Sequence, residues 1–279
     1  MTRALQRRCP ALIAACALFA QAGCDGREVE VLGSAAKADA GGERSACPDP
    51  PIADFCQSIP RLEGAQRVDG RALEFCGLSP MLFEVSRAVW TRHPPQPLPE
   101  IVFVRAAWSP EALHVHAHVI DPKIIVSPNE VLSEGDGVEF YAAATDQLTG
   151  PTDGTRDGGA LQVIVTPESG QQPARARIYY HPSPGVQLEE AVPPTWFATR
   201  LVDDGYDVEV RIPWASRVGA GMRVGFDFAL NVTDSDTATG REQQAALGYR
   251  SVTLPTNCTA DVGPQPFCDD RTWCVPLLE

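Results

Sequence analysis

The sequence lacks a basic excess and a long apolar run. It contains 23 lysine and arginine residues against 36 acidic ones, which gives a net charge of −13. This negative excess argues against binding to nucleic acid, and against binding to anionic lipid through a basic patch. The apolar run Ala11–Ala20 is shorter than the roughly 20 residues that a membrane-spanning helix requires. We therefore expect no nucleic-acid partner and no spanning helix in this run.

Signatures of catalysis are also missing. The chain contains no G-x-S-x-G, no H-E-x-x-H and no phosphate-binding loop. Acidic residues are plentiful, but no spacing identifies a catalytic pair of carboxylates on different strands. We therefore predict that the protein is not an enzyme and has no catalytic residues.

The first 23 residues have the composition of a signal peptide. They carry three arginines and no acidic residue, and their apolar run ends in small residues. Two forms of processing fit this segment. The sequence A-Q-A that ends at Ala22 suits ordinary signal cleavage. The sequence Q-A-G-C that ends at Cys24 resembles the lipobox of bacterial lipoproteins, in which the cysteine carries the lipid, although Gln21 stands where leucine is usual.

The cysteine count favours the lipoprotein interpretation. Of nine cysteines, Cys9 and Cys16 would leave with the signal, and lipidation of Cys24 would remove a third from pairing. An even number in an exported chain predicts disulfides, here three, whose pairing the sequence does not define. The six disulfide candidates are Cys47, Cys56, Cys76, Cys258, Cys268 and Cys274.

These features predict three segments. Residues 1–23 are the signal peptide, residues 24–46 are the lipidated cysteine and a flexible tether of small and charged residues, and residues 47–279 form one domain. A single lipid anchor would hold the domain at a membrane surface without spanning it. The predicted location is the bacterial cell envelope, lipid-anchored, on the periplasmic side or at the cell surface.

The domain has the pattern of an all-β protein. Apolar and polar residues alternate in several short runs separated by turn residues, as in half-buried strands, and no stretch has a sustained helical stripe. Many short strands predict an antiparallel, jelly-roll-like β-sandwich, with cysteines near both ends of the domain able to fasten them. The predicted strands are 101–108, 112–120, 137–143, 160–165, 176–180, 206–212 and 223–232.

Four stretches resemble, in order, the family-9 carbohydrate-binding modules and their sugar-binding-like, DOMON-related relatives. They are R-V-D-G at residues 67–70, the block from Val104 to Pro122, E-G-D-G-V-E-F-Y at 134–141, and the pair D-D-G-Y-D-V-E-V-R-I-P-W and V-G-F-D-F-A-L-N-V-T-D at 203–214 and 224–234. The resemblance covers about residues 67–250 and implies an antiparallel β-sandwich, in agreement with the strand pattern.

The resemblance also implies a ligand site. The family's sugar-contacting Glu corresponds to Glu139, which either points into a pocket or lies on a solvated rim, and its contacting Arg corresponds to Gln162. In sugar-binding members the ligand lies between two tryptophans. Leu132 or Ser133 stands at the first of these positions, and Tyr249 is the aromatic nearest to the second. Loss of aromatic stacking should weaken sugar binding.

The tryptophans divide into two groups. Trp108 and Trp214 match structural positions of the family and are predicted in the core, and Trp273 is predicted to pack on a disulfide. Trp90 and Trp196 are the predicted exposed ones. We predict ligand contacts from Glu139, Gln162, Tyr249 and Trp196.

Three histidines and an acidic loop offer alternatives. His114, His116 and His118 alternate with apolar residues and should share one strand face, where two imidazoles could reach a metal ion. Haem ligation, known in DOMON relatives, is less favoured because the chain has few methionines. Asp234 and Asp236 would suit a structural calcium ion, although the full calcium-loop pattern is missing.

The main prediction from sequence is a non-catalytic carbohydrate-binding-like lipoprotein that binds a glycan or another polar ligand without a required cofactor. The alternatives are a haem- or metal-binding electron-transfer module and a structural envelope protein that binds other proteins.

Overall fold

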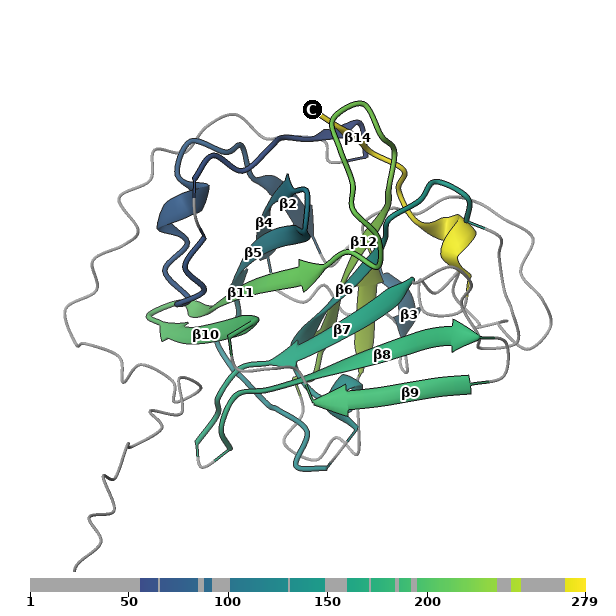
Figure 1. The fold of residues 1–279 in the computed structure, drawn as a ribbon. Helices are drawn as coiled ribbons and strands as arrows, with labels where there is room; N and C mark the ends of the chain where they lie inside the picture. Colours follow the sequence, from purple (N-terminus) through teal and green to yellow (C-terminus); the bar gives the residue numbers. More distant parts are fainter. Residues whose placement is uncertain are drawn as a thin grey trace, which may run out of the picture. The chain divides into compact units, whose positions relative to one another are not determined.

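The computed structural model describes residues 56–64, 66–84, 88–91, 101–129, 131–148, 160–170, 172–183, 186–191, 195–234, 242–246 and 269–279 (Figure 1). The predicted signal peptide and tether lie outside these residues, as do Cys24, Cys47, Cys258 and Cys268. The only helices among the described residues are short 3₁₀ turns, namely η1 (Leu73–Phe75), η3 (Leu132–Glu134) and η5 (Asp270–Thr272). None of the described helices has the length and apolar character needed to span a membrane.

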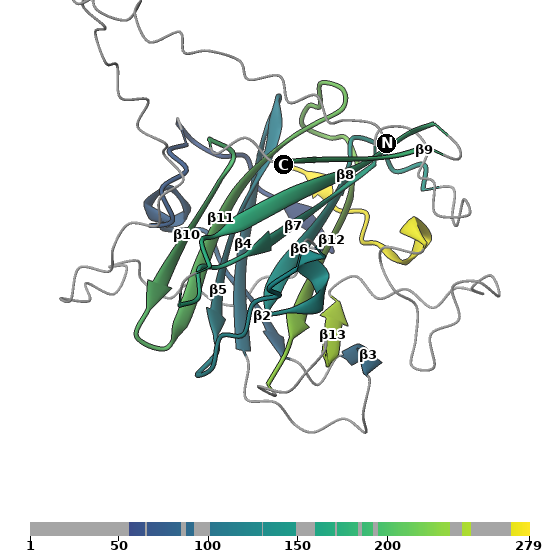
Figure 2. The ribbon, with the colours of Figure 1, turned by 90° about the horizontal axis from the view of Figure 1, so that it is seen from below.

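Two antiparallel sheets form the body of the fold. The first has five strands, which lie side by side in Figure 2. Their order is β10 (Phe197–Val202), β11 (Gly205–Pro213), β5 (Ala112–Ile120), β4 (Ile101–Ser109) and β2 (Met81–Glu84). The second sheet has seven strands. Their order is β3 (Ala88–Thr91), β13 (Gln243–Ala246), β12 (Gly225–Val232), β6 (Gly137–Ala143), β7 (Leu161–Thr166), β8 (Arg175–Ser183) and β9 (Val186–Ala191).

The apolar faces of both sheets share one core. On the five-stranded sheet, Val115 and Val208 belong to this core, and on the seven-stranded sheet Phe140 and Phe228 lie with ring centroids 5.5 Å apart. Trp108 and Trp214 are buried, as the sequence predicts. The arrangement confirms the predicted antiparallel β-sandwich, because every other residue of each central strand enters the space between the sheets.

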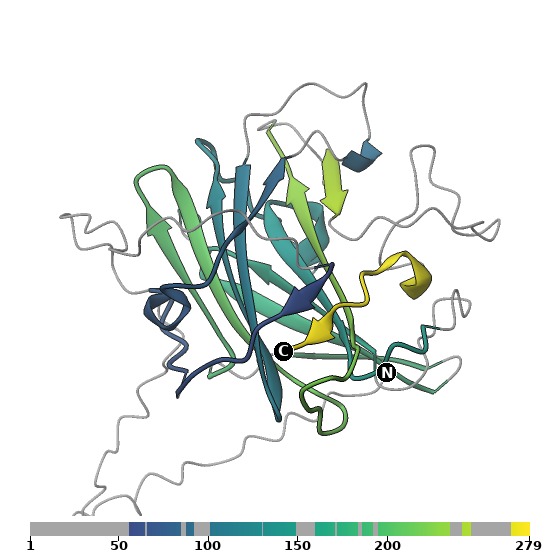
Figure 3. The ribbon, with the colours of Figure 1, turned by 90° about the horizontal axis from the view of Figure 1, so that it is seen from above.

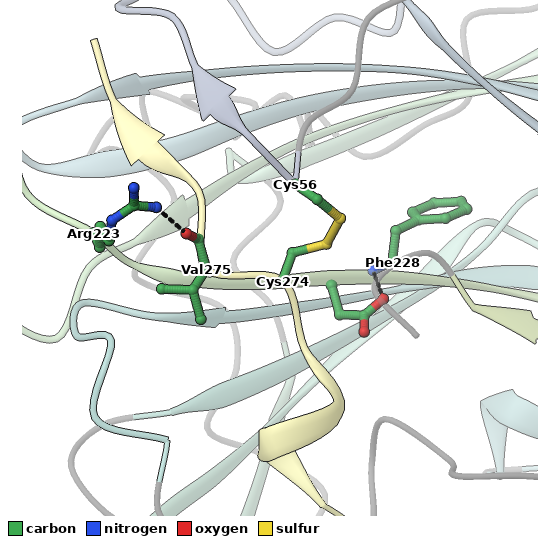
Figure 4. The surroundings of a disulfide bond; sticks show 6 residues. Cys56, Arg223, Phe228, Cys274 and Val275 are labelled. Carbon is green, nitrogen blue, oxygen red and sulfur yellow. Dashed lines mark hydrogen bonds between the residues drawn. A yellow bond between two sulfur atoms is a disulfide. The ribbon is translucent and has the colours of Figure 1, made fainter. Parts of the chain in front are cut away.

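The two ends of the domain meet at a third, two-stranded sheet. Strand β1 (Ser58–Ile59) pairs in parallel with β14 (Leu277–Leu278), and Figure 3 shows the purple and yellow arrows side by side. A disulfide joins Cys56 to Cys274 beside this pair (Figure 4). The predicted fastening of the domain ends is therefore confirmed. Cys76 is disulfide-bonded as well.

Candidate functional site

The stretch before β6 brings Glu139 to the outer face of the seven-stranded sheet. Alternation along β6 directs Val138 and Phe140 into the core and leaves Glu139 and Tyr141 on the opposite face. The strand begins at Gly137 because the preceding residue, Asp136, is held in place. The Asp136 carboxylate accepts hydrogen bonds from the backbone N–H groups of Ile125 and Thr233. This fixed start determines which residues of β6 face outward.

The Glu139 carboxylate accepts hydrogen bonds from three side chains. Asn231 Nδ2 donates to Oε1 at 2.6 Å, and Gln162 Nε2 donates to Oε2 at 2.7 Å. The Tyr141 hydroxyl also donates to Oε2. The structure thus brings together Glu139 and Gln162, the two polar residues that the sequence predicts, and adds Asn231 and Tyr141 to them.

One further amide extends this network. Gln244 Nε2 donates to Asn231 Oδ1 at 3.0 Å, while its buried Oε1 has no hydrogen-bond partner among the described residues. We use the name polar row for Gln162, Glu139, Asn231 and Gln244, which come from the neighbouring strands β7, β6, β12 and β13. Amides and a carboxylate supply both donors and acceptors, the groups that bind hydroxyls.

The polar row is open to solvent at one end. Gln162 is half-buried, whereas Glu139 is 1% exposed and Asn231 and Gln244 are fully buried. Glu139 therefore does not lie on a solvated rim. Gln162 is therefore the most accessible member of the polar row, whereas the Glu139 carboxylate is enclosed with its three donors.

The aromatic residues predicted at the site are not all placed near the polar row. Trp196 is half-buried against the core between the sheets, away from the outer face that carries Glu139, and Tyr249 lies outside the described residues. Leu132, at a family tryptophan position, is 1% exposed and offers no stacking surface. Trp90 is the register partner of Gln244 across β3 and β13.

Trp273 occupies a position that the sequence does not predict. It is fully buried on the outer face of the seven-stranded sheet, and its ring centroid lies 5.4 Å from that of Tyr141. The Cys56–Cys274 disulfide belongs to the core between the sheets, whereas Trp273 belongs to the cluster on the outer face; packing of Trp273 on another disulfide stays a prediction. Strand-like alternation over the last residues would have indicated this division, but the segment is too short to identify as a strand.

The three histidines share the outer face of the five-stranded sheet, as predicted, and each has a protein contact there. His114 contacts Gln66, and its Nε2 lies 3.0 Å from Ser109 Oγ. His118 Nδ1 lies 2.9 Å from Asp207 Oδ1, and His116 Nε2 lies 3.3 Å from the same oxygen. Within the described ranges, no three His, Cys, Asp or Glu side chains converge as a metal site. The contacts that the three imidazoles make within the protein do not favour the metal-binding alternative.

Burial shifts the pKa values of titratable groups on the outer face of the five-stranded sheet. Burial, with the charge of Arg211 adding to it, lowers the pKa of His114 to about 4, and burial likewise lowers the pKa of His116. Burial raises the pKa of Glu209 to about 7, although backbone N–H groups of Asp69 and Gly70 and the Gln66 amide donate to its carboxylate. These contacts tie the residue 66–70 segment to β11, which indicates a structural role.

The acidic loop after β12 is described only at its start. Asp234 accepts a hydrogen bond from Lys123 Nζ at its backbone oxygen, and Asp236 lies outside the described residues. Burial raises the pKa of Asp121 to about 6; the hydrogen bond from the Lys123 backbone N–H opposes this shift, and the charge of Asp234 adds a smaller contribution to it. The structural calcium ion stays a prediction.

Comparison with known proteins gives one family and several similar structures. A family model described as carbohydrate family 9 binding domain-like matches residues 102–248, which is more than half of the chain. A family 9 carbohydrate-binding module from Caldicellulosiruptor kristjanssonii in complex with cellotriose is 17% identical, with a TM-score of 0.55 over 80% of this chain and 94% of that one. A glucose complex of such a module from the same organism is 18% identical, with a TM-score of 0.53 over 80% of this chain and 96% of that one. No curated protein matches the sequence.

Proposed function

The chain belongs to the carbohydrate family 9 binding domain-like family, and from this premise we propose that its sandwich binds a neutral glycan through the polar row. The observation that supports the proposal is the polar row itself, in which Gln162 Nε2 donates to Glu139 Oε2 at 2.7 Å on the outer face of the seven-stranded sheet. In this binding mode the Gln162 amide makes the first contact with a sugar hydroxyl. The ligand then exchanges hydrogen bonds with the Glu139 carboxylate and the neighbouring amides, and no chemical step follows.

Similar solved structures indicate which sugars to test, because one holds cellotriose and another holds glucose. We expect wild-type protein to bind cellotriose in isothermal titration calorimetry. Glu139→Ala should weaken binding about 10- to 100-fold, since a hydrogen bond to a charged group contributes about 1.5–3 kcal/mol. Gln162→Ala should weaken it about fivefold, because an amide bond contributes about 1 kcal/mol.

The matched control is Glu63→Gln, which changes an exposed acid in the segment before the first sheet. This variant should bind cellotriose like the wild type. Circular dichroism must show that all variants are folded. Equal affinity of the wild type and Glu139→Ala, or no binding of cellotriose, glucose or any sugar on a glycan array by wild-type protein, would contradict the proposal.

We also propose that the domain acts at the bacterial cell envelope, held by a lipid on Cys24. The signal-like composition of residues 1–23, the Q-A-G-C sequence and the even number of remaining cysteines support this location. Full-length protein expressed in a bacterial host with labelled palmitate should incorporate the label, and Cys24→Ser should abolish incorporation and release the protein from the membrane fraction. Membrane retention of the serine variant without label would overturn the anchor.

A further inference from the structure

The C-terminal residues 269–279 link the buried disulfide to the face that carries the polar row. Cys274 and Phe226 exchange two backbone hydrogen bonds of 3.0 Å, so this part of the chain is extended against the start of β12. In extended chain, neighbouring side chains point to opposite faces. Cys274 accordingly belongs to the core between the sheets and is bonded to Cys56 (Figure 4). Trp273 belongs to the cluster on the outer face.

Further bonds fix this segment along its length. Arg223 donates to the backbone oxygen of Val275 at 2.8 Å, and the Leu278 N–H donates to Met222 at the same distance. Before Trp273, the Asp269 side chain caps η5 by accepting from the Arg271 N–H at 3.0 Å. The position of Trp273 is therefore set from both sides of it in the sequence.

Small residues of the sheet make room for the Trp273 indole. Ala143, Ala229 and Ala246 belong to the same cluster, and they come from β6, β12 and β13. A Cβ atom on Gly225 would lie 3.3 Å from Trp273 Cε3, which is tighter than ordinary packing. The indole thus packs against four small residues of the sheet. Because it is completely buried, it does not itself stack on a ligand.

The contact with Tyr141 connects this segment to the ligand site. The rings of Trp273 and Tyr141 are tilted by 51° with centroids 5.4 Å apart, and both side chains are fully buried. The Tyr141 hydroxyl donates to Glu139. Because packed aromatic rings restrict each other's orientation, the indole limits the positions of the Tyr141 ring, whose hydroxyl also accepts from Gln162 Nε2 at 3.3 Å.

We infer that Trp273 is a positioning residue for the glycan site, acting on Glu139 through Tyr141. The inference rests on the proposed function, and it places a determinant of affinity beyond residues 102–248, the part that matches the family model. Without the indole, the Tyr141 ring gains freedom and its hydroxyl no longer holds Glu139 Oε2 in one orientation. Ligand affinity should then fall although no atom of Trp273 touches the sugar.

A double-mutant cycle tests this route. Cellotriose affinity is measured for wild type, Trp273→Leu, Tyr141→Phe and the double variant. We expect each single variant to weaken binding about 5- to 20-fold, and the double variant to be no weaker than the worse single one, because both changes disable the same contact. Trp273→Phe, which retains an aromatic ring, should recover most of the affinity. Multiplicative losses in the double variant would overturn the inference.

A ligand-free signal separates this inference from the proposed function. The Tyr141 Cζ resonance, assigned by its loss in Tyr141→Phe, should shift in Trp273→Leu and return towards the wild-type position in Trp273→Phe. If wild-type protein binds no sugar, the proposed function fails. If the Tyr141 resonance is unchanged in Trp273→Leu, the positioning role of Trp273 is overturned, whether or not sugar binds. If Trp273→Leu does not fold, the affinity and resonance of Trp273→Phe decide, and wild-type values for both overturn the inference.

Discussion

Replacing Asp207 with alanine is expected to lower the free energy of unfolding by about 3–5 kcal/mol, the typical cost of removing one partner from a buried charge cluster. Asp207 lies on β11 and is 5% exposed. Arg200 donates to its Oδ2 at 2.8 Å, and His118 and His116 approach its Oδ1 at 2.9 and 3.3 Å. Without the carboxylate, the Arg200 guanidinium and the two imidazoles would lose the group that binds all three, and among the described residues only His118 would retain a nearby acid, Asp204 at 3.8 Å.

The pH dependence of this loss has a definite sign. Burial opposes ionisation of Asp207, but the hydrogen bonds from His116, His118 and Arg200 outweigh it and hold the pKa of the carboxyl well below its usual value. A carboxyl with a lowered native pKa contributes stability that is present above the unfolded pKa of about 4 and is lost as the pH falls below it. The difference between wild type and Asp207→Ala should therefore be constant from pH 5 to 7. Below pH 4 it should narrow by up to about 1.4 kcal/mol per pH unit.

Urea unfolding of both proteins at pH 7, 5 and 3.5 checks these values. Asp203→Ala is the matched control, because Asp203 is an exposed acid in the turn that joins β10 to β11. Its effect should stay within about 0.5 kcal/mol. A loss below 1 kcal/mol for Asp207→Ala, or a difference that widens in acid, would show that the cluster does not stabilise the sandwich through this carboxylate.

Strands with strict alternation were predictable from the sequence. The pattern A-L-H-V-H-A-H-V-I coincides with β5, and G-V-E-F-Y-A-A coincides with β6. Strands β1, β2, β3, β9, β10, β13 and β14 were not predicted, because they are short or lack sustained alternation. Strand β13 has the sequence Q-Q-A-A, in which Gln244 is buried because Asn231 satisfies its amide N–H. A polar residue whose burial depends on a partner from another strand carries no local signal.

The candidate site, like the strands, was predictable from the sequence only in part. The family resemblance predicted Glu139 and Gln162 as ligand contacts, and this inference does not require the order of the strands. Asn231 reaches Glu139 because β12 pairs with β6, and Gln244 reaches Asn231 because β13 pairs with β12. Trp273 arrives from the far end of the chain. Pairings over such sequence separations depend on which apolar faces meet in the core, which a linear pattern does not define.

Replacing Gly135 with alanine is expected to destabilise the fold by about 3–5 kcal/mol, at the upper end of single substitutions. The cause is space rather than backbone angle, because Gly135 has an ordinary extended conformation with φ −138°. A Cβ atom there would lie 2.1 Å from Ser127 N and 2.7 Å from Val126 C. Both are backbone atoms, so no side-chain rotation relieves the overlap, and the chain on one side must move.

The ligand site around Glu139 should be displaced together with the chain at Gly135. The residue after Gly135 is Asp136, whose N–H donates to the Ile125 oxygen at 2.8 Å and whose carboxylate holds Thr233 at 2.6 Å, just before β6 begins. Displacing this anchor shifts the strand that carries Glu139, so Gly135→Ala should lose cellotriose affinity as well as thermal stability. Gly219→Ala is the control, because its Cβ would meet no atom within 4 Å, and it should unfold within about 1 kcal/mol of the wild type. Equal stability of the two glycine variants would mean that Gly135 does not pack against residues 126–127 in solution, and the fixed start of β6 would lose its physical basis.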